Sequence, residues 1–331
     1  MEGQSKTRIL HTPHLLLSIA ASVGKPVINY VKTGVHDGFL IFLNPNFEIY
    51  FMFEWLESFR SKWQKYGQPG SQVNLNSEIV KNQVINLPSL LEQNEVSRFL
   101  NKFNDLIELH QRSHNMLNQK KQVLLRKMFP SLREDIPSIR FNSFEQDWKL
   151  SNLGDLGEVL TGNTPSTNME SYWEKGKNGY IWITPSDISK YKTSESMRYL
   201  SEEGWKKARK VPENSVLITS IASIGKNTIN QMPAAFNQQI NAIIPKENSA
   251  YFILTCMEKN KVQFSSIAGK TATPIINKTD FKKFKVKVPQ HPEQLVVGDL
   301  FEKIDDILSY YQKKLDVLKK IKSIYLSKMF L

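Results

Sequence analysis

The chain has 331 residues, which is enough for two domains, and its mean hydropathy of −0.39 is that of an ordinary soluble protein. It contains no apolar run of about 18 residues and does not begin like a signal peptide, which excludes a membrane span and favours the cytoplasm. A single cysteine excludes intrachain disulfides and cysteine-based metal clusters, and the net charge of +12 favours a polyanionic partner.

An internal repeat organises the chain. Residues 1–13 are expected to be irregular, and the repeat begins at His14. Segment 15–25 aligns with 216–226 at an offset of 201 positions, and both segments end in Gly-Lys. We expect a buried strand followed by a glycine turn in each copy. The same offset pairs a predicted strand at 38–43 with one at 239–244, and a predicted helix at 50–65 with one at 251–264.

Each repeat ends in a long predicted helix, at 88–130 and at 289–331. In both segments apolar residues recur at alternating spacings of four and three, which is the pattern of a coiled-coil seam. A helix that is apolar along one stripe over such a length needs a long partner, and the simplest partner is the other copy. The predicted seam includes Leu100, Phe103, Ile107 and Leu117 in the first helix and Phe301, Ile304, Leu308, Leu315 and Leu318 in the second.

Polar residues interrupt this seam. Lys121 and Lys322 occupy the same seam position in the two copies, and we expect their charged ends to reach solvent. His110 and His114 lie one helical turn apart, a spacing that can hold zinc. No glutamate follows His110 and no third ligand is apparent, so a polar patch in the seam is favoured and no metal site is expected.

A second domain is predicted after a linker at 131–143. Within it, a polar turn at 162–166 and a strand that runs into a turn at 181–188 precede the second Gly-Lys turn. Asp187 is expected to close its turn by accepting a backbone hydrogen bond. The first repeat has no counterpart of residues 144–212, so its domain is expected to be shortened at the front.

The order of these motifs resembles the specificity subunit of type I restriction-modification enzymes. The resemblance covers the chain from His14 and rests on segments 162–166, 172–173, 181–188, 220–226, 237–241, 289–294 and 328–330. It implies an α+β fold, in which mixed α/β target-recognition domains alternate with two long helices that pair as an antiparallel coiled coil. The implied division is a partial first target-recognition domain at 1–87, a first spacer helix at 88–130, a linker at 131–143, a complete second target-recognition domain at 144–288 and a second spacer helix at 289–331.

The resemblance also implies a function and partners. It implies a non-catalytic subunit that binds a bipartite double-stranded DNA target, docks methylation subunits on its helices and joins a restriction and translocation subunit through the complex. No cofactor is expected on this chain, because S-adenosylmethionine, ATP and Mg²⁺ belong to the partner subunits. The sequence itself contains no apparent catalytic motif. The alternative is a truncated or silent subunit that docks partners without reading DNA.

Candidate DNA contacts lie in the polar turns. The second Gly-Lys turn is not a phosphate-binding P-loop, because Ser220 stands where that motif requires glycine. Lys226 either contacts a phosphate or belongs to a purely structural turn. Asn237 and Gln238 either read adenine in the major groove or close a strand turn. The full set of candidates is Lys25, Asn163, Thr164, Ser223, Lys226, Asn227, Asn237, Gln238, Lys270 and Thr271.

Overall fold

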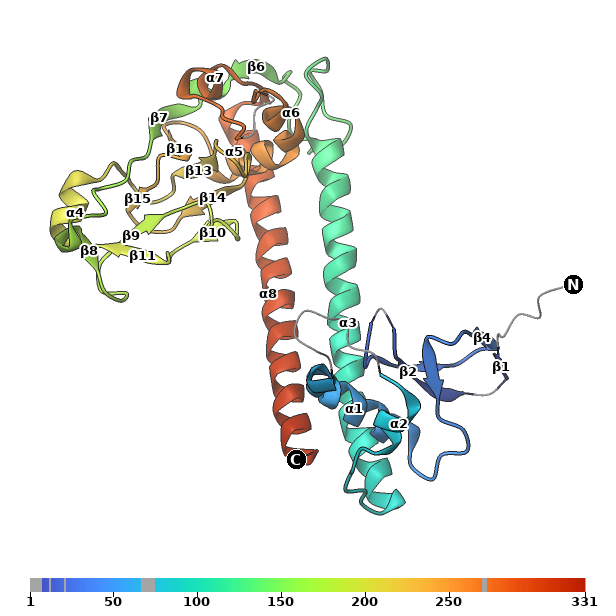
Figure 1. Cartoon of the computed structure of the whole chain (residues 1–331). Helices are drawn as coiled ribbons and strands as arrows, with labels where there is room; N and C mark the ends of the chain where they lie inside the picture. Colours follow the sequence, from blue (N-terminus) through green and yellow to red (C-terminus); the bar gives the residue numbers. More distant parts are fainter. Residues whose placement is uncertain (1–7, 12, 21, 67–74, 270–272, 331) are drawn as a thin grey trace, which may run out of the picture. The chain divides into compact units, whose positions relative to one another are not determined.

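A computed structural model of the chain describes residues 8–330 apart from 12, 21, 67–74 and 270–272. The chain divides into two compact units: unit 1 comprises 1–114 with 310–331, and unit 2 comprises 115–309. Both divisions fall inside a long helix, α3 (Leu90–Met128) and α8 (His291–Met329), so each unit contains one part of each helix (Figure 1).

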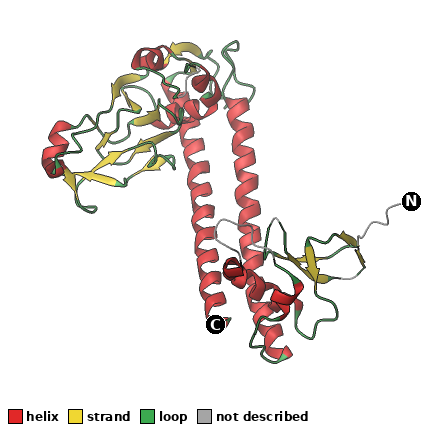
Figure 2. Ribbon diagram, viewed as in Figure 1, coloured by secondary structure: helices red, strands yellow, loops and turns green. Residues whose placement is uncertain are grey.

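Unit 1 combines short strands with short helices on its parts of α3 and α8 (Figure 2). Its other elements are β1 (Arg8–Leu10), β2 (His14–Ser18), β3 (Pro26–Asn29), β4 (Thr33–Val35), β5 (Phe39–Ile41), α1 (Ile49–Phe59), a 3-10 turn (Arg60–Tyr66) and α2 (Ser77–Lys81). An antiparallel sheet has the order β3-β2-β5, and β1 pairs antiparallel with β4. The Glu48 carboxylate begins α1 by accepting a hydrogen bond from the Phe51 backbone N–H at 2.6 Å.

Unit 2 is built around two five-stranded sheets. They have the orders β10-β14-β13-β16-β7 and β12-β15-β9-β11-β8, and β17 pairs with β6. Its strands are β6 (Lys149–Asn152), β7 (Gly157–Thr161), β8 (Trp173–Glu174), β9 (Tyr180–Ile183), β10 (Lys192–Thr193), β11 (Arg198–Leu200), β12 (Lys210–Val211), β13 (Val216–Thr219), β14 (Asn227–Asn230), β15 (Ala234–Phe236), β16 (Ile240–Pro245) and β17 (Lys285–Val288). Its helices, besides parts of α3 and α8, are α4 (Glu202–Lys207), α5 (Ala250–Lys259), α6 (Lys261–Ser266) and α7 (Lys278–Lys283), with 3-10 turns at Leu153–Asp155 and Glu170–Tyr172.

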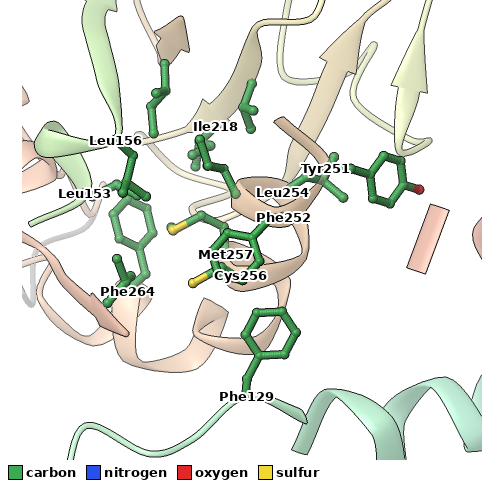
Figure 3. Packing of buried hydrophobic residues seen from close by; sticks show 14 of the residues in the cluster. Phe129, Leu153, Leu156, Ile218, Tyr251, Phe252, Leu254, Cys256, Met257 and Phe264 are labelled. Carbon is green, nitrogen blue, oxygen red and sulfur yellow. The ribbon is translucent and has the colours of Figure 1, made fainter. Parts of the chain in front are cut away.

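Helix α5 forms the centre of the larger core of unit 2 (Figure 3). Phe252 stacks on Phe129 with ring centroids 5.5 Å apart, and Ile218 of β13 belongs to the same buried cluster. The single cysteine, Cys256, is buried there, and burial raises the pKa of its thiol to about 12. The thiol therefore acts as a small apolar side chain.

The structure extends the internal repeat further towards the start of the chain than the sequence predicts. Ile9 of β1 pairs with Gly34 of β4, just as Lys210 of β12 pairs with Ala235 of β15, again at an offset of 201. The expectation that residues 1–13 are irregular is therefore wrong for Arg8–Leu10. Strand pairing uses backbone groups, so β1 and β12 keep the same partners although their side chains differ.

The long helices pair antiparallel, as predicted. In unit 1 the ring of Phe99 lies 5.0 Å from that of Tyr325, and His110 lies 5.8 Å from Tyr311. A later residue of α3 therefore contacts an earlier residue of α8, which means that the two helices run in opposite directions. In unit 2, Phe129 contacts Phe301 in the same sense. Within the described residues, no helix has the length and apolar character needed to cross a membrane.

The predicted seam is the packed face of both helices. Leu100, Phe301, Ile304, Leu308 and Leu315 are buried, and Phe103, Ile107, Leu117 and Leu318 are half-buried.

The expectation that the seam lysines reach solvent is wrong. The Lys121 side chain is fully buried, and its Nζ lies 2.6 Å from a Glu258 oxygen and 2.8 Å from Asp305 Oδ1. Lys322 Nζ lies 2.8 Å from Glu54 Oε2. The partners come partly from α1 and α5, so the heptad pattern alone could not reveal them. Close carboxylates offset the cost of removing these ammonium groups from water.

Candidate functional site

Several loops of unit 2 meet at one end of its sheets. Strand β16 runs antiparallel to both β7 and β13, and β13 runs antiparallel to β14. The ends of β7 and β13 therefore lie beside the starts of β14 and β16. Strands β9 and β15 are parallel and end on the same side, where the Asn237 N–H donates to the Ile183 carbonyl at 2.9 Å. We call the loops at 162–166, 184–189, 220–226 and 237–239 the loop edge.

Three of the candidate residues form one polar cluster on the loop edge. The Thr164 hydroxyl bonds to the side-chain oxygen of Gln238, and the Asn237 amide donates to Thr164 Oγ1 at 3.3 Å. The Asn237 oxygen accepts from the Gln239 backbone N–H at 2.8 Å, so Asn237 also closes its turn. Gln238 is exposed, and the cluster holds its amide at the surface.

Asn163 positions a basic segment rather than pointing outward. Its amide nitrogen donates to the Lys207 carbonyl at 3.0 Å, and its amide oxygen accepts from the Arg209 N–H at 2.6 Å. The exposed Arg209 guanidinium bonds in turn to the Thr161 carbonyl at 2.8 Å. Arg209 was not a candidate, because the segment that contains it lies far from the turn motifs in sequence.

The second Gly-Lys turn places a lysine at the same edge. Gly225 has φ +83°, a conformation that favours glycine. The Lys226 N–H donates to Thr219 Oγ1 at 3.0 Å, which leaves the Lys226 side chain exposed. A Cβ atom at position 225 would lie 2.9 Å from Lys261 Cγ, so the stem of Lys261 covers the turn.

Two shallow hollows flank Lys226. One, of about 280 Å³, is lined by Ser223, Lys226 and Lys261 among others. The second, of about 430 Å³, has Lys190, Lys226 and Lys261 in its wall together with Glu258. Glu258 is already paired with Lys121, so Lys226 of the loop edge and the adjacent Lys190 and Lys261 make this region basic.

The remaining candidates have different positions. The Asn227 amide donates to the Leu254 carbonyl at 2.9 Å, which directs it inward against α5. The Ala222 N–H donates to the Pro274 carbonyl at 3.1 Å, so the segment after residue 272 adjoins the Gly-Lys turn. Lys270 and Thr271 lie outside the described residues. Lys25 is exposed in the equivalent turn of unit 1.

The turn at 184–187 is a structural feature of the loop edge. Asp187 accepts hydrogen bonds from the Thr184 N–H at 2.8 Å and from the Met197 N–H at 2.8 Å. The prediction that Asp187 closes its turn by accepting a backbone hydrogen bond is confirmed, although the donor lies three residues before it and the turn is therefore not an Asx turn.

Comparison with known proteins identifies the family of the chain. The sequence profile described as "Type I restriction modification DNA specificity domain" matches residues 1–119 and 145–322. The chain belongs to this family. The MjaIX type I restriction enzyme specificity subunit of Methanocaldococcus jannaschii is 31% identical over 185 residues, which cover 53% of this chain and 42% of that protein. The HindI type I restriction enzyme specificity subunit of Haemophilus influenzae is 27% identical over 165 residues, covering 47% and 36%.

A solved structure shares the fold. The crystal structure of the type I restriction-modification system S subunit from M. genitalium aligns with a TM-score of 0.72 at 15% identity. The alignment covers 98% of this chain and 84% of that one. In contrast, the aligned segments span less than half the length of the MjaIX and HindI specificity subunits.

Proposed function

We propose that this chain is a DNA sequence-recognition subunit of a type I restriction-modification enzyme and that the loop edge of unit 2 contacts one part of the target. Family membership supports this role. Lys190, Lys226 and Lys261 are suited to phosphate contacts, which position a protein on DNA. The amides of Asn237 and Gln238 are suited to base edges in the major groove. The adjacency of these two kinds of side chain on one edge carries the proposal.

The outer faces of the long helices are suited to docking partner subunits. Leu106, Leu109, Met116 and Val123 of α3 are exposed apolar residues at helical spacings of three and seven, and the repeat-related Ile307, Tyr310, Val317 and Ile324 of α8 are exposed as well. Exposed apolar stripes mark interaction sites. Two equivalent stripes are suited to two copies of one partner, and we assign them to methylation subunits. The chemistry of methyl transfer then belongs to those subunits.

The proposed DNA surface is tested by substitution within the complete complex. Lys226→Ala should weaken DNA binding roughly threefold to tenfold and lower the slope of affinity against salt by about one. Gln238→Ala should lower discrimination at one base pair by about 1–3 kcal/mol with little change in the salt slope. Fluorescence anisotropy over a salt series measures both. The control is Lys149→Ala, an exposed lysine on β6 away from the loop edge. Unchanged binding by both variants would remove the loop edge from the proposal.

The function as a whole is tested by co-expression with the methylation subunits and genome-wide mapping of methylated adenines. A two-part methylated motif is the expected result. A stable complex without methylation would instead support the alternative, a subunit that docks partners without reading DNA. Failure to form any complex would overturn the assignment of the helices as docking surfaces.

A further inference from the structure

Unit 1 has three strand edges that are covered in unit 2. The sheet of unit 1 has the order β3-β2-β5, and the repeat-related sheet of unit 2 continues beyond both edges, with β10 beside β14 and β7 beside β16. Strand β4 pairs with β1 alone, whereas its counterpart β15 also pairs with β9. Within the described part of the chain, β3, β4 and β5 therefore each lack one neighbour.

The three covering strands of unit 2 come from one continuous segment, Gly157 to Thr193. Strand β7 pairs antiparallel with β16, and β9 and β10 pair parallel with β15 and β14. A single polypeptide segment thus closes all three edges. The register of the repeat indicates which edge of unit 1 each strand of such a segment would meet.

An apolar hollow lies at these open edges. It measures about 490 Å³ and has Leu16, Val27, Ile28, Val35 and Phe39 among its lining residues. None of its described lining residues is a lysine, an arginine or a carboxylate, so it does not attract phosphate groups. An uncharged apolar surface of this kind favours a polypeptide over DNA.

The same surface is interior in unit 2. Thr228, Phe236 and Ile240, the counterparts of Val27, Val35 and Phe39, have no exposed surface. Phe236 and Ile240 share a buried cluster with Ile181 and Ile183 of β9, which lie in the covering segment. Val27, by contrast, is 37% exposed and Phe39 is half-buried, whereas Val35 is buried in unit 1 as well.

The backbone hydrogen bonds at these strand edges also differ between the two units. In unit 2 the Ile229 and Gln231 N–H groups donate to the carbonyls of Tyr191 and Thr193 at 2.8 and 2.9 Å. The position equivalent to Ile229 is Ile28, on β3, and no described strand lies beyond it. An open edge beside an apolar hollow is the arrangement that accepts an added strand.

We propose that unit 1 binds a partner polypeptide through β3, β4 and β5, and that the bound segment has the pattern of residues 157–193. The occupant supplies three short strands and directs apolar side chains like those of Ile181 and Ile183 into the hollow. Residues 157–193 are themselves paired within unit 2, so the segment bound by unit 1 is a second one of the same pattern. This inference concerns strand pairing and stands whether or not the loop edge binds DNA.

The test uses the full-length chain co-expressed with a tagged second copy of residues 144–208 as the probe. The fragment should be captured by the chain at one to one. Amide hydrogen exchange across residues 26–41 should then slow at least tenfold, because the open edges become paired. Exchange in β13 and β14 should stay unchanged, since unit 2 keeps its own segment.

A substitution pair localises the binding. The counterpart of Val27 is Thr228, whose hydroxyl lies 2.8 Å from that of Thr193 in β10, so a lysine at position 27 would obstruct the equivalent strand. Val27→Lys should weaken capture at least tenfold. Val84→Lys, the same exchange at a 93% exposed valine outside the hollow, should leave capture unchanged.

Three results would overturn the proposal. One is failure of the fragment to bind the unsubstituted chain. A second is equal binding to Val27→Lys. The third is exchange in β3 and β5 of the free chain that is already as slow as in β14 and β16, since those edges would then be covered. Exchange across α1 verifies that unit 1 of the Val27→Lys variant is folded, and the first and third readouts require no substitution.

Discussion

At the scale of single residues, the two repeats preserve a lysine at one position of the helix seam and change its partners. Lys121 meets two carboxylates, Asp305 and Glu258. Lys322 meets the Glu54 carboxylate and the side-chain oxygen of Asn104, at 2.7 Å for the latter. Asn104 and Asp305 are equivalent positions in the repeat. Buried pairs of this kind contribute little net stability but cost several kcal/mol to break, and they can fix the register of paired helices.

The charge state of this cluster depends on pH. Burial raises the pKa of Asp305 to about 6, against the opposing attraction of the Lys121 ammonium. Burial lowers the pKa of Lys121, but the negative charges of Glu258 and Asp305 raise it by more. The net result is a raised pKa for the lysine. Because the Asp305 pKa is higher in the folded state, its contribution favours folding at low pH. That contribution is complete below the unfolded pKa near 4 and is lost as the pH rises through about 6.

Asp305→Asn should remove this contribution and copy the arrangement that Asn104 already provides in unit 1. On lowering the pH from 7.5 to 5, the free energy of unfolding of the original chain should gain on the order of 1 kcal/mol relative to the variant. Urea unfolding of both proteins at the two pH values measures the difference. Groups that do not interact with Asp305 contribute equally in both proteins and cancel in the comparison. An identical change in both proteins would show that Asp305 is not the responsible group.

At the scale of elements, the hydrogen bonds that connect the start of each long helix to its domain are the same in the two units. The Gln294 side chain accepts from the Ser249 N–H at 3.2 Å and donates to the Pro289 carbonyl at 3.0 Å. Gln93 does the same with the Glu48 N–H and the Pro88 carbonyl, at 2.9 and 2.8 Å. The Pro-x-x-x-Glu-Gln pattern at 88–93 and 289–294 thus connects the start of α3 to the start of α1 and the start of α8 to the start of α5.

The glutamate of this pattern has a further role in unit 2. Buried Glu293 pairs with Arg140 of the linker, with two contacts of 2.8 Å. A bidentate pair of this kind fixes geometry as well as charge. It attaches the linker to the first turn of α8.

Gly298 is the one glycine in α8, and the packing of α5 explains it. A Cβ atom there would lie 2.8 Å from Ser249 Oγ and 3.2 Å from the Phe252 backbone nitrogen. In unit 1 the equivalent residue is Ser97, whose hydroxyl bonds to the Glu48 carboxylate. The same helix contact therefore differs between the two copies. Gly298 packs against Ser249 in unit 2, and Ser97 bonds to Glu48 in unit 1.

Gly298→Ala should therefore destabilise unit 2 although alanine is the better helix former. Overpacking costs about 1–3 kcal/mol, which exceeds the propensity gain of about 1 kcal/mol. Thermal unfolding measures the change. Ser309→Ala, at an exposed position of the same helix, serves as the control and should not lower the melting temperature. A higher melting temperature for Gly298→Ala would mean that α5 moves away at little cost.

At the scale of the whole molecule, the features that could be predicted from the sequence are those that repeat or have a long period. The heptad stripe of 88–130 and the offset of 201 were enough to predict the pairing of the two long helices. Strand β1 was missed, because a strand of three residues with one buried side chain, Leu10, is too short to show an alternating pattern. The partners of Lys121 and the role of Asn163 were also missed, since both depend on contacts between segments that are distant in sequence.

The duplicated apolar stripes give the last prediction. If each stripe docks one methylation subunit, Met116→Lys on α3 and Val317→Lys on α8 should each remove one copy, because a buried unpaired ammonium disfavours an apolar contact. Native mass spectrometry of the co-expressed complex should then find two methylation subunits on the original chain, one on each single variant and none on the double variant. Val262→Lys, at an exposed valine on α6, is the matched control and should retain both. Loss of both copies in a single variant would mean that the two subunits dock cooperatively, and retention in the double variant would place the docking surface elsewhere.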